Sequence, residues 1–137
     1  MKAVLNGLAT FALAMSLAGV ASANDDWKGG DAEKGEKVFK KCAACHTVEE
    51  GGPNRVGPNL HGIIDRPTAS HAGYKYSAAM TKKGTEGLKW TEENLFTYLE
   101  KPSDFVPGTN MTFIGLKKPE DRKDIIAYLE KAAGHTK

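Results

Sequence analysis

The stretch Cys42-Ala43-Ala44-Cys45-His46 holds the only two cysteines of the 137-residue chain. Two cysteines three positions apart lie on one side of a helical turn, so both sulfurs are placed to bond the two vinyl groups of one porphyrin. His46 follows directly, and a neutral imidazole nitrogen is a strong ligand for haem iron. The pentapeptide therefore predicts covalent haem attachment through Cys42 and Cys45, with His46 as the first axial ligand.

Three other uses of a cysteine pair fit the surrounding sequence less well. A redox-active dithiol of the thioredoxin kind expects a preceding strand, whereas a helical stretch, residues 31–41, comes first here. A structural zinc site needs two more ligands, and the remaining histidines, His61, His71 and His135, are scattered without a paired spacing. A disulfide between residues this close restrains little of the unfolded chain. Haem attachment is favoured over all three.

The first 23 residues have the pattern of a cleaved export signal. Lys2 precedes a mostly apolar run over residues 8–20, and Ala21-Ser22-Ala23 offers the small residues that signal peptidase accepts. The run is shorter than the roughly 20 apolar residues of a membrane span, and an uncleaved anchor is the alternative. Subtracting 23 from 137 leaves 114 residues, enough for one domain at 24–137. The sequence therefore predicts a signal peptide at 1–23 and a periplasmic protein.

The charge balance argues against nucleic acid as a partner. The whole chain has a formal net charge of +2, with 19 basic and 17 acidic residues. Without Lys2 of the signal segment, 18 basic against 17 acidic residues leave +1, and two haem propionates would push that sum slightly negative. A nucleic-acid-binding domain is expected to be far more basic. Lysines do cluster before the cysteine motif and again at Lys117 and Lys118, where they form either an ordinary solvated face or a docking surface for an acidic partner.

Hydrophobic periodicity and capping residues predict helices and no substantial sheet. Helices are expected over residues 31–41, over 76–82 with an end near Gly84, from a Thr91 cap to Glu100, and from Pro119 to just before Gly134. Pro102 is expected to stop the third of them. Residues 47–73 are rich in Gly, Pro and Asn, and a segment of this length without a period needs another organiser, such as a large buried cofactor.

Elimination gives a candidate for the second axial ligand. Thioether, imidazole, thiolate and phenolate are the usual choices, and both thiols are already used. Of the two methionines beyond residue 23, Met111 lies in a turn-rich segment, 107–111, which is able to present a side chain inward. Met80 lies in a short helical patch instead, and a methionine is by default a core residue. Met111 is therefore predicted as the second ligand, and the histidines are weaker candidates.

These residues carry a resemblance to a known family. The chain resembles class I cytochrome c of the mitochondrial type, and most closely its bacterial branch, cytochrome c2, from Gly30 to Ala133. The matching motifs are Cys-Ala-Ala-Cys-His-Thr-Val at 42–48, Gly-Pro-Asn-Leu-His-Gly at 57–62, Tyr-Leu-Glu-Lys-Pro at 98–102, Pro-Gly-Thr-Asn-Met at 107–111 and Asp-Ile-Ile-Ala-Tyr-Leu at 124–129. The resemblance implies an all-α single domain with three main helices and loops wrapped around a covalently bound haem c.

The resemblance also implies roles for single residues. Cys42 and Cys45 would be the thioether anchors, and His46 and Met111 the axial ligands. Pro58 resembles the residue whose carbonyl accepts the proton of the ligating histidine, and Tyr98 the tyrosine that hydrogen-bonds near the methionine sulfur. Residues similar to those around the haem propionates are Arg66, Tyr76, Ser77, Trp90 and Thr109. The residues that resemble those at the family's crossing of the first and last helices are Gly35, Phe39, Ile125 and Tyr128.

The chain departs from the mitochondrial pattern at several positions. Three additional residues lengthen the segment between Met80 and Trp90, and Met80 replaces an asparagine near the haem. A second thioether there raises the hypothesis that Met80 competes for the iron if the Met111 loop opens. Two lysines of the family's docking ring are replaced, by Ser103 and Asn110. The ring is matched by Lys37, Lys41, Arg55, Lys117 and Lys118.

A haem iron with both axial positions filled exchanges only electrons. The sequence therefore predicts a monomeric electron carrier and not an enzyme, with a cytochrome bc complex as donor and a terminal oxidase or a photosynthetic reaction centre as acceptor. Membrane contact is expected only through these complexes. The alternative is a haem enzyme or a small-ligand sensor with a displaceable sixth ligand.

Overall fold

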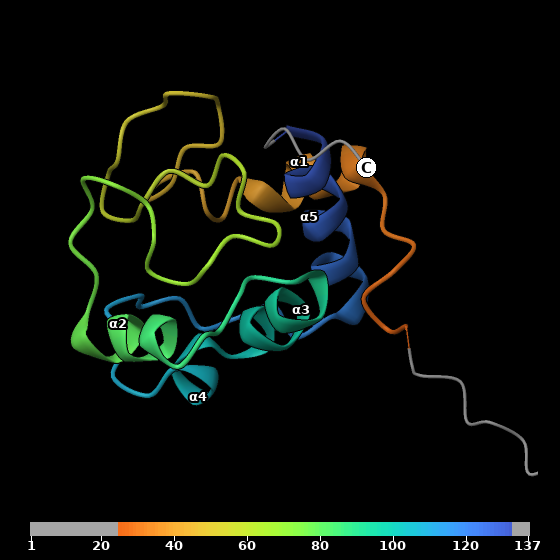
Figure 1. Ribbon diagram of the computed structural model, residues 1–137. Helices are drawn as coiled ribbons and strands as arrows, with labels where there is room; N and C mark the ends of the chain where they lie inside the picture. Colours follow the sequence, from red (N-terminus) through yellow and green to blue (C-terminus); the bar gives the residue numbers. More distant parts are fainter. Residues whose placement is uncertain (1–24, 133–137) are drawn as a thin grey trace, which may run out of the picture.

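The computed structural model describes residues 25–132 and shows five helices joined by long loops (Figure 1). They are α1 (Ala32–Phe39), α2 (Ala78–Thr85), α3 (Glu92–Glu100), α4 (Pro102–Phe105) and α5 (Pro119–Ala132). Among the described residues, β pairing is confined to an isolated bridge between Pro67 and Lys89. The predicted all-α class is therefore confirmed. The predicted signal segment and the predicted helix end at Gly134 lie outside the described residues.

The three main helices begin where their capping residues predict. Asp31 caps α1, because its Oδ1 accepts from the backbone N–H of Glu33 at 2.9 Å and of Lys34 at 3.2 Å. Thr91 caps α3 through a 3.1 Å hydrogen bond to the backbone N–H of Asn94. Helix α5 starts at Pro119, which lacks the N–H that a first helical residue leaves unpaired.

The Asp31 cap gives a prediction for the pH dependence of stability. The capping N–H groups hold the pKa of the Asp31 carboxyl below its usual value of 3.8. Because the pKa of Asp31 is lower in the folded state, its ionised carboxyl stabilises the fold above about pH 4. This stabilisation is lost as the pH falls through the pKa of the folded state. Asp31→Asn keeps a capping oxygen without the charge. We expect its melting temperature to lie a few degrees below wild type at pH 6, with the two converging below pH 3 in thermal melts. A gap of equal size at both pH values would contradict this account.

Two helices differ from the sequence-based expectation. Helix α2 runs through Gly84 to Thr85, and the chain turns only at Gly87, whose φ is +85°. Gly84 lies inside the helix, and its backbone lies directly against the carbonyl oxygen of Thr68, where a side chain would not fit. Pro102 ends α3 as predicted but also begins the short α4, which was not predicted. Proline fits the first turn of a helix, so it both stops one helix and starts the next.

Helices α1 and α5 cross closely, as Figure 1 shows, and α3 packs on α5. A Cβ on Gly35 would overlap the carbonyl oxygen of Asp124, so the two backbones touch at this point. Next to the crossing, the rings of Phe39 and Tyr128 lie 5.3 Å apart. This crossing joins the two ends of the domain and confirms the contact expected there.

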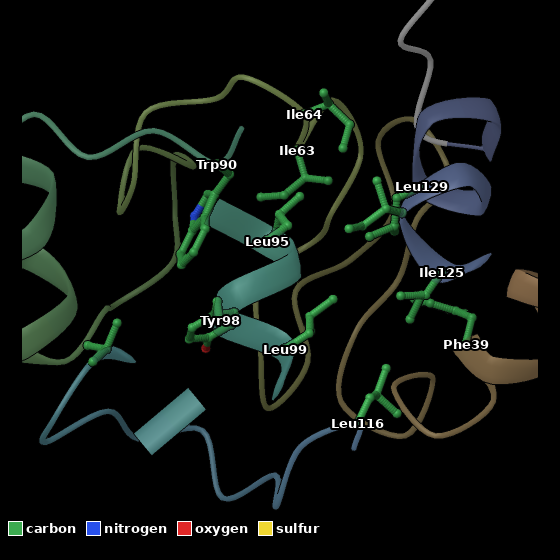
Figure 2. Packing of buried hydrophobic residues seen from close by; sticks show 12 residues of the cluster. Phe39, Ile63, Ile64, Trp90, Leu95, Tyr98, Leu99, Leu116, Ile125 and Leu129 are labelled. Atoms are coloured by element: carbon green, nitrogen blue, oxygen red, sulfur yellow. The ribbon is translucent and has the colours of Figure 1, made fainter. Parts of the chain in front are cut away.

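The buried hydrophobic side chains gather from both sides of α3 (Figure 2). Leu99 projects from α3 toward Ile125 of α5. Tyr98 projects from the other side of α3, where its ring packs against Trp90. The long segment 47–73 has no regular structure, and buried side chains organise it instead: the Nδ2 of Asn59 donates to Thr47 Oγ1 at 2.8 Å and to Glu49 O at 3.0 Å. Over residues 25–132 no helix has the length and apolar character needed to cross a bilayer.

Candidate haem-binding site

A cavity of about 300 Å³ lies beside α3, and every residue predicted for the site lines it. Its walls are mostly apolar and include Leu60, Ile63, Leu95, Leu99 and Leu129. The segment 42–46 borders it after α1, and the 107–111 turn borders it after α4. The structure thus brings together predicted site residues that are separated by as many as 69 positions, from Cys42 to Met111.

His46 is held with one ring nitrogen occupied and the other left for a ligand. Its backbone continues the turn from Cys42, with an N–H to carbonyl distance of 2.9 Å. Its Nδ1 lies 2.7 Å from the carbonyl oxygen of Pro58. A carbonyl oxygen only accepts, so Nδ1 carries the proton and Nε2 keeps its lone pair. Burial lowers the pKa of His46, and the positive charge of Arg66 lowers it further, so the imidazole is neutral and able to bind a metal.

The two cysteine side chains are half-buried at the cavity and are not joined in a disulfide. Burial raises the pKa of the Cys42 thiol to about 11, and the neighbouring Cys45 adds to the effect. A dithiol oxidoreductase needs the opposite shift, because its nucleophile is a thiolate. Among the described residues, no group of three or more His, Cys, Asp or Glu side chains is arranged to hold a metal ion, which argues against the zinc interpretation.

Met111 is half-buried, and its sulfur is oriented by a tyrosine. The hydroxyl of Tyr98 donates to Met111 Sδ at 3.0 Å. Tyr98 is buried on α3, and burial raises its pKa to about 12, so the hydroxyl keeps its proton at neutral pH. Thr109 fixes the backbone of the same turn, because its Oγ1 accepts from the Met111 N–H at 3.2 Å. One sulfur lone pair is used in this contact, and another is left for iron.

The polar part of the cavity wall contains the remaining predicted residues. The guanidinium of Arg66 donates to His61 O at 3.0 Å and to Asn59 O at 3.2 Å. The Tyr76 hydroxyl accepts from the His71 N–H at 3.2 Å, and Trp90 is buried beside Tyr98, with ring centroids 4.7 Å apart. Ser77 has a structural task as well, since its Oγ caps α2 by accepting from the Met80 N–H at 3.0 Å.

Sequence reasoning missed Tyr74 as a residue of this wall. Its hydroxyl donates to the carbonyl of Val56 at 2.7 Å, and its ring packs edge-on against Tyr76 at 4.8 Å. The hydrogen bond from Tyr74 to Val56 joins the loop that carries Tyr76 to the loop that carries Pro58. The available signal is the alternation Tyr74-Lys75-Tyr76, which puts both rings on one side of an extended segment and Lys75 on the other.

The donor set and the walls fit haem. An apolar cavity suits the porphyrin, a neutral imidazole and a thioether are established haem-iron ligands, and two thiols stand beside them for covalent attachment. The charged guanidinium of Arg66 and the hydroxyl groups of Tyr76, Ser77 and Thr109 on the polar part suit carboxylates.

Comparison with known proteins agrees with this fit. The family model described as Cytochrome c matches residues 32–133. A cytochrome c of Arabidopsis thaliana is 52% identical over 103 residues, which cover 74% of this chain and 89% of the relative. A cytochrome c of Cochliobolus lunatus is 52% identical over 103 residues, covering 74% and 93%, and one of Guizotia abyssinica is 50% identical over 102 residues, covering 74% and 89%.

These relatives correct the predicted location. The periplasmic prediction depended on residues 1–23, which lie outside the described part of the chain. The similar proteins come from plants and fungi, and eukaryotic cells have no periplasm, so the prediction of a periplasmic location is wrong. The relatives equally give no support to an export signal or to a photosynthetic role.

The family match covers most of the chain, and its extent agrees with the helices and the cavity described above. Cytochromes c are electron-transfer haem proteins that have redox partners. They carry haem c, which contains iron and is covalently attached to the protein. The chain belongs to the cytochrome c family.

Proposed function

We propose that this protein is a one-electron carrier in which Cys42 and Cys45 anchor haem c and His46 and Met111 are its axial ligands. The observation that carries the proposal is that one cavity holds both candidate ligand atoms, each already oriented by a hydrogen bond from the protein. Preorganised ligands need little rearrangement when the iron changes charge. Bound haem c supplies a ferric and ferrous iron couple, and we propose that no other chemistry takes place there.

The two hydrogen bonds have opposite electronic effects. Pro58 accepts the Nδ1 proton of His46, which makes the imidazole a better electron donor and fixes its orientation. Tyr98 donates to the Met111 sulfur, which withdraws electron density from that ligand. Thioether ligation favours ferrous iron, as is general for cytochromes c, and burial in an apolar cavity disfavours the additional positive charge of ferric iron. We therefore expect a high reduction potential.

The polar residues of the wall are proposed to hold the propionates. Arg66 supplies a positive charge, and Tyr76, Ser77, Trp90 and Thr109 supply hydrogen-bond donors on the same cavity. Support comes from the burial of Arg66, whose charge is costly to keep in an apolar site without a negative partner.

Electron exchange needs a surface for partners. We propose that a cytochrome bc complex is the donor and a terminal oxidase the acceptor, and that the protein docks as a monomer. The basic residues matched to the docking ring are exposed: Lys37, Lys41, Arg55, Lys117 and Lys118. Attraction between such a surface and an acidic partner should fall with salt, since the screening length is about 8 Å at physiological ionic strength.

Carbon monoxide binding distinguishes a carrier from a haem enzyme or sensor. If Met111 closes the sixth position, the reduced protein at neutral pH should show no change in its visible spectrum under carbon monoxide. Cyclic voltammetry should then give one reversible one-electron wave. The same protein unfolded in guanidinium chloride is the positive control, because unfolding breaks the Met111 bond and carbon monoxide displaces whatever ligand replaces it. Stoichiometric carbon monoxide binding to the folded protein would favour the enzyme or sensor and overturn the proposal.

A further inference from the structure

We propose that Met80 is a second, latent thioether ligand, which binds the iron when Met111 is removed from it. This inference depends on the proposed function, because it requires haem iron in the cavity with a sulfur ligand. Met80 thereby receives a metal-binding role, although the fold does not require a methionine at this position of α2 and His46 and Met111 already supply two ligands.

Met80 lines the same cavity as Met111. Its side chain is half-buried and packs against the hydrophobic core. Among the residues lining the cavity, sulfur is carried by Cys42, Cys45, Met80 and Met111. The two cysteines are used for attachment, so Met80 is the remaining sulfur once Met111 is lost. An apolar residue such as leucine would fill the same space without offering a lone pair.

The segments that carry the two methionines touch. An ideal Cβ on Gly108 would lie 3.3 Å from the Cβ of Ala79, so the 107–111 turn abuts the first turn of α2. The start of α2 is fixed there by Ser77, which caps the helix through the N–H of Met80. Met80 therefore enters the cavity from the part of the wall next to the Met111 turn.

Over residues 25–132, helix α2 contacts loops, at Thr68 and Gly108, but is not packed into the helical core. In the described part of the chain it packs on no other helix and contains no buried residue. A small shift of its first turn therefore leaves the α1, α3 and α5 packing intact. The methionine side chain adds three rotatable bonds, which let the sulfur reach different positions from one backbone.

Met111 outcompetes Met80 in the intact protein because its sulfur is oriented. Tyr98 holds Met111 Sδ at 3.0 Å, whereas over residues 25–132 the Met80 sulfur accepts no hydrogen bond. Orientation in advance removes the entropic cost of fixing a flexible side chain at the iron. Loss of Met111 removes the competitor and leaves a soft thioether, which haem iron accepts.

The test uses the ferric, haem-loaded full chain and its weak far-red absorption band, which reports sulfur bound to iron. Met111→Ala is expected to keep a shifted far-red band, and Met111→Ala combined with Met80→Leu is expected to lose it. A single Met111→Ala variant without the band, or a double variant that retains it, overturns the inference. Water, hydroxide or the amine of Lys41 would then be the replacement ligand.

Two further variants keep the test decisive. Met111→Leu conserves volume in case the alanine variant does not fold, and imidazole is the probe. Imidazole should bind the Met111→Leu/Met80→Leu protein about tenfold or more tightly than Met111→Leu, since no sulfur must be displaced. Equal affinities overturn the inference. Met80→Leu alone tests the proposed function separately: a retained band supports Met111 as the native ligand, and a lost band refutes that assignment.

Discussion

Gly57→Ala is expected to displace the His46 imidazole and to weaken its bond to the iron. A Cβ at this position would overlap the ring, with Nδ1 at 2.7 Å and Nε2 at 2.8 Å. The backbone of Gly57 has no room to retreat, because its N–H donates to Cys45 O at 2.8 Å and its carbonyl accepts from Arg55 N at 2.9 Å. The ring must therefore move, and the 2.7 Å bond to Pro58 is broken.

The expected loss of stability in Gly57→Ala is large for the addition of a single methyl group. Overpacking costs about 1–3 kcal/mol, and a buried donor left without its acceptor costs roughly the same again. We expect the free energy of unfolding of the haem-loaded protein to fall by about 3 kcal/mol in guanidinium titrations, with a change in the ferric spectrum. Gly51→Ala is the matched control, because its φ of +68° gives only a backbone penalty and no atom lies within 4 Å. Equal losses in the two variants, with unchanged spectra, would contradict the steric mechanism.

The helices were predictable because their signals are local. Asp31 and Thr91 cap helices within three residues of their own position, and Pro119 fixes the start of α5 without reference to the rest of the chain. Gly84 misled the sequence-based reading of α2, since glycine is needed there for the close approach of the Thr68 backbone, 16 positions away, and not to end the helix. A glycine that ends a helix and a glycine that another backbone approaches look the same in sequence.

The residues of the site also fall into two groups, those that local sequence predicts and those that it does not. The cysteine pair and His46 are contiguous, so their chemistry follows from spacing alone. Pro58 and Arg66 lie in a segment without periodicity, and their positions were expected only from the family resemblance. Tyr74 was missed because its partner is a backbone carbonyl in another loop: the alternation Tyr74-Lys75-Tyr76 indicates which side of the segment its ring is on but not this partner. The predicted location is wrong for a different reason: it depended on a short apolar N-terminal run outside the described residues, whereas the similar proteins are cytochromes c of plants and fungi.

The contact that joins the two ends of the domain gives the second large prediction, for Gly35→Ala. On an isolated helix this change should be favourable by about 1 kcal/mol, because alanine is the better helix former. In the folded protein the new Cβ would overlap the carbonyl oxygen of Asp124 and lie 2.7 Å from Tyr128 Cβ. Backbone atoms of α5 cannot rotate away as a side chain can, so the two helices must separate.

Separation of α1 from α5 would disturb more than the overlapping atoms. The Asp31 N–H donates to Asp124 Oδ1 at 2.8 Å, and this bond holds the first turn of α1 against α5. We therefore expect Gly35→Ala to reduce the free energy of unfolding by at least about 3 kcal/mol, the upper range for overpacking, as measured by chemical denaturation with haem bound. Glu36→Ala, on the exposed side of α1, should change it by less than about 0.5 kcal/mol. If helix propensity dominated instead, Gly35→Ala would be at least as stable as wild type and up to about 1 kcal/mol more stable, and the close crossing would not be what fixes glycine at this position.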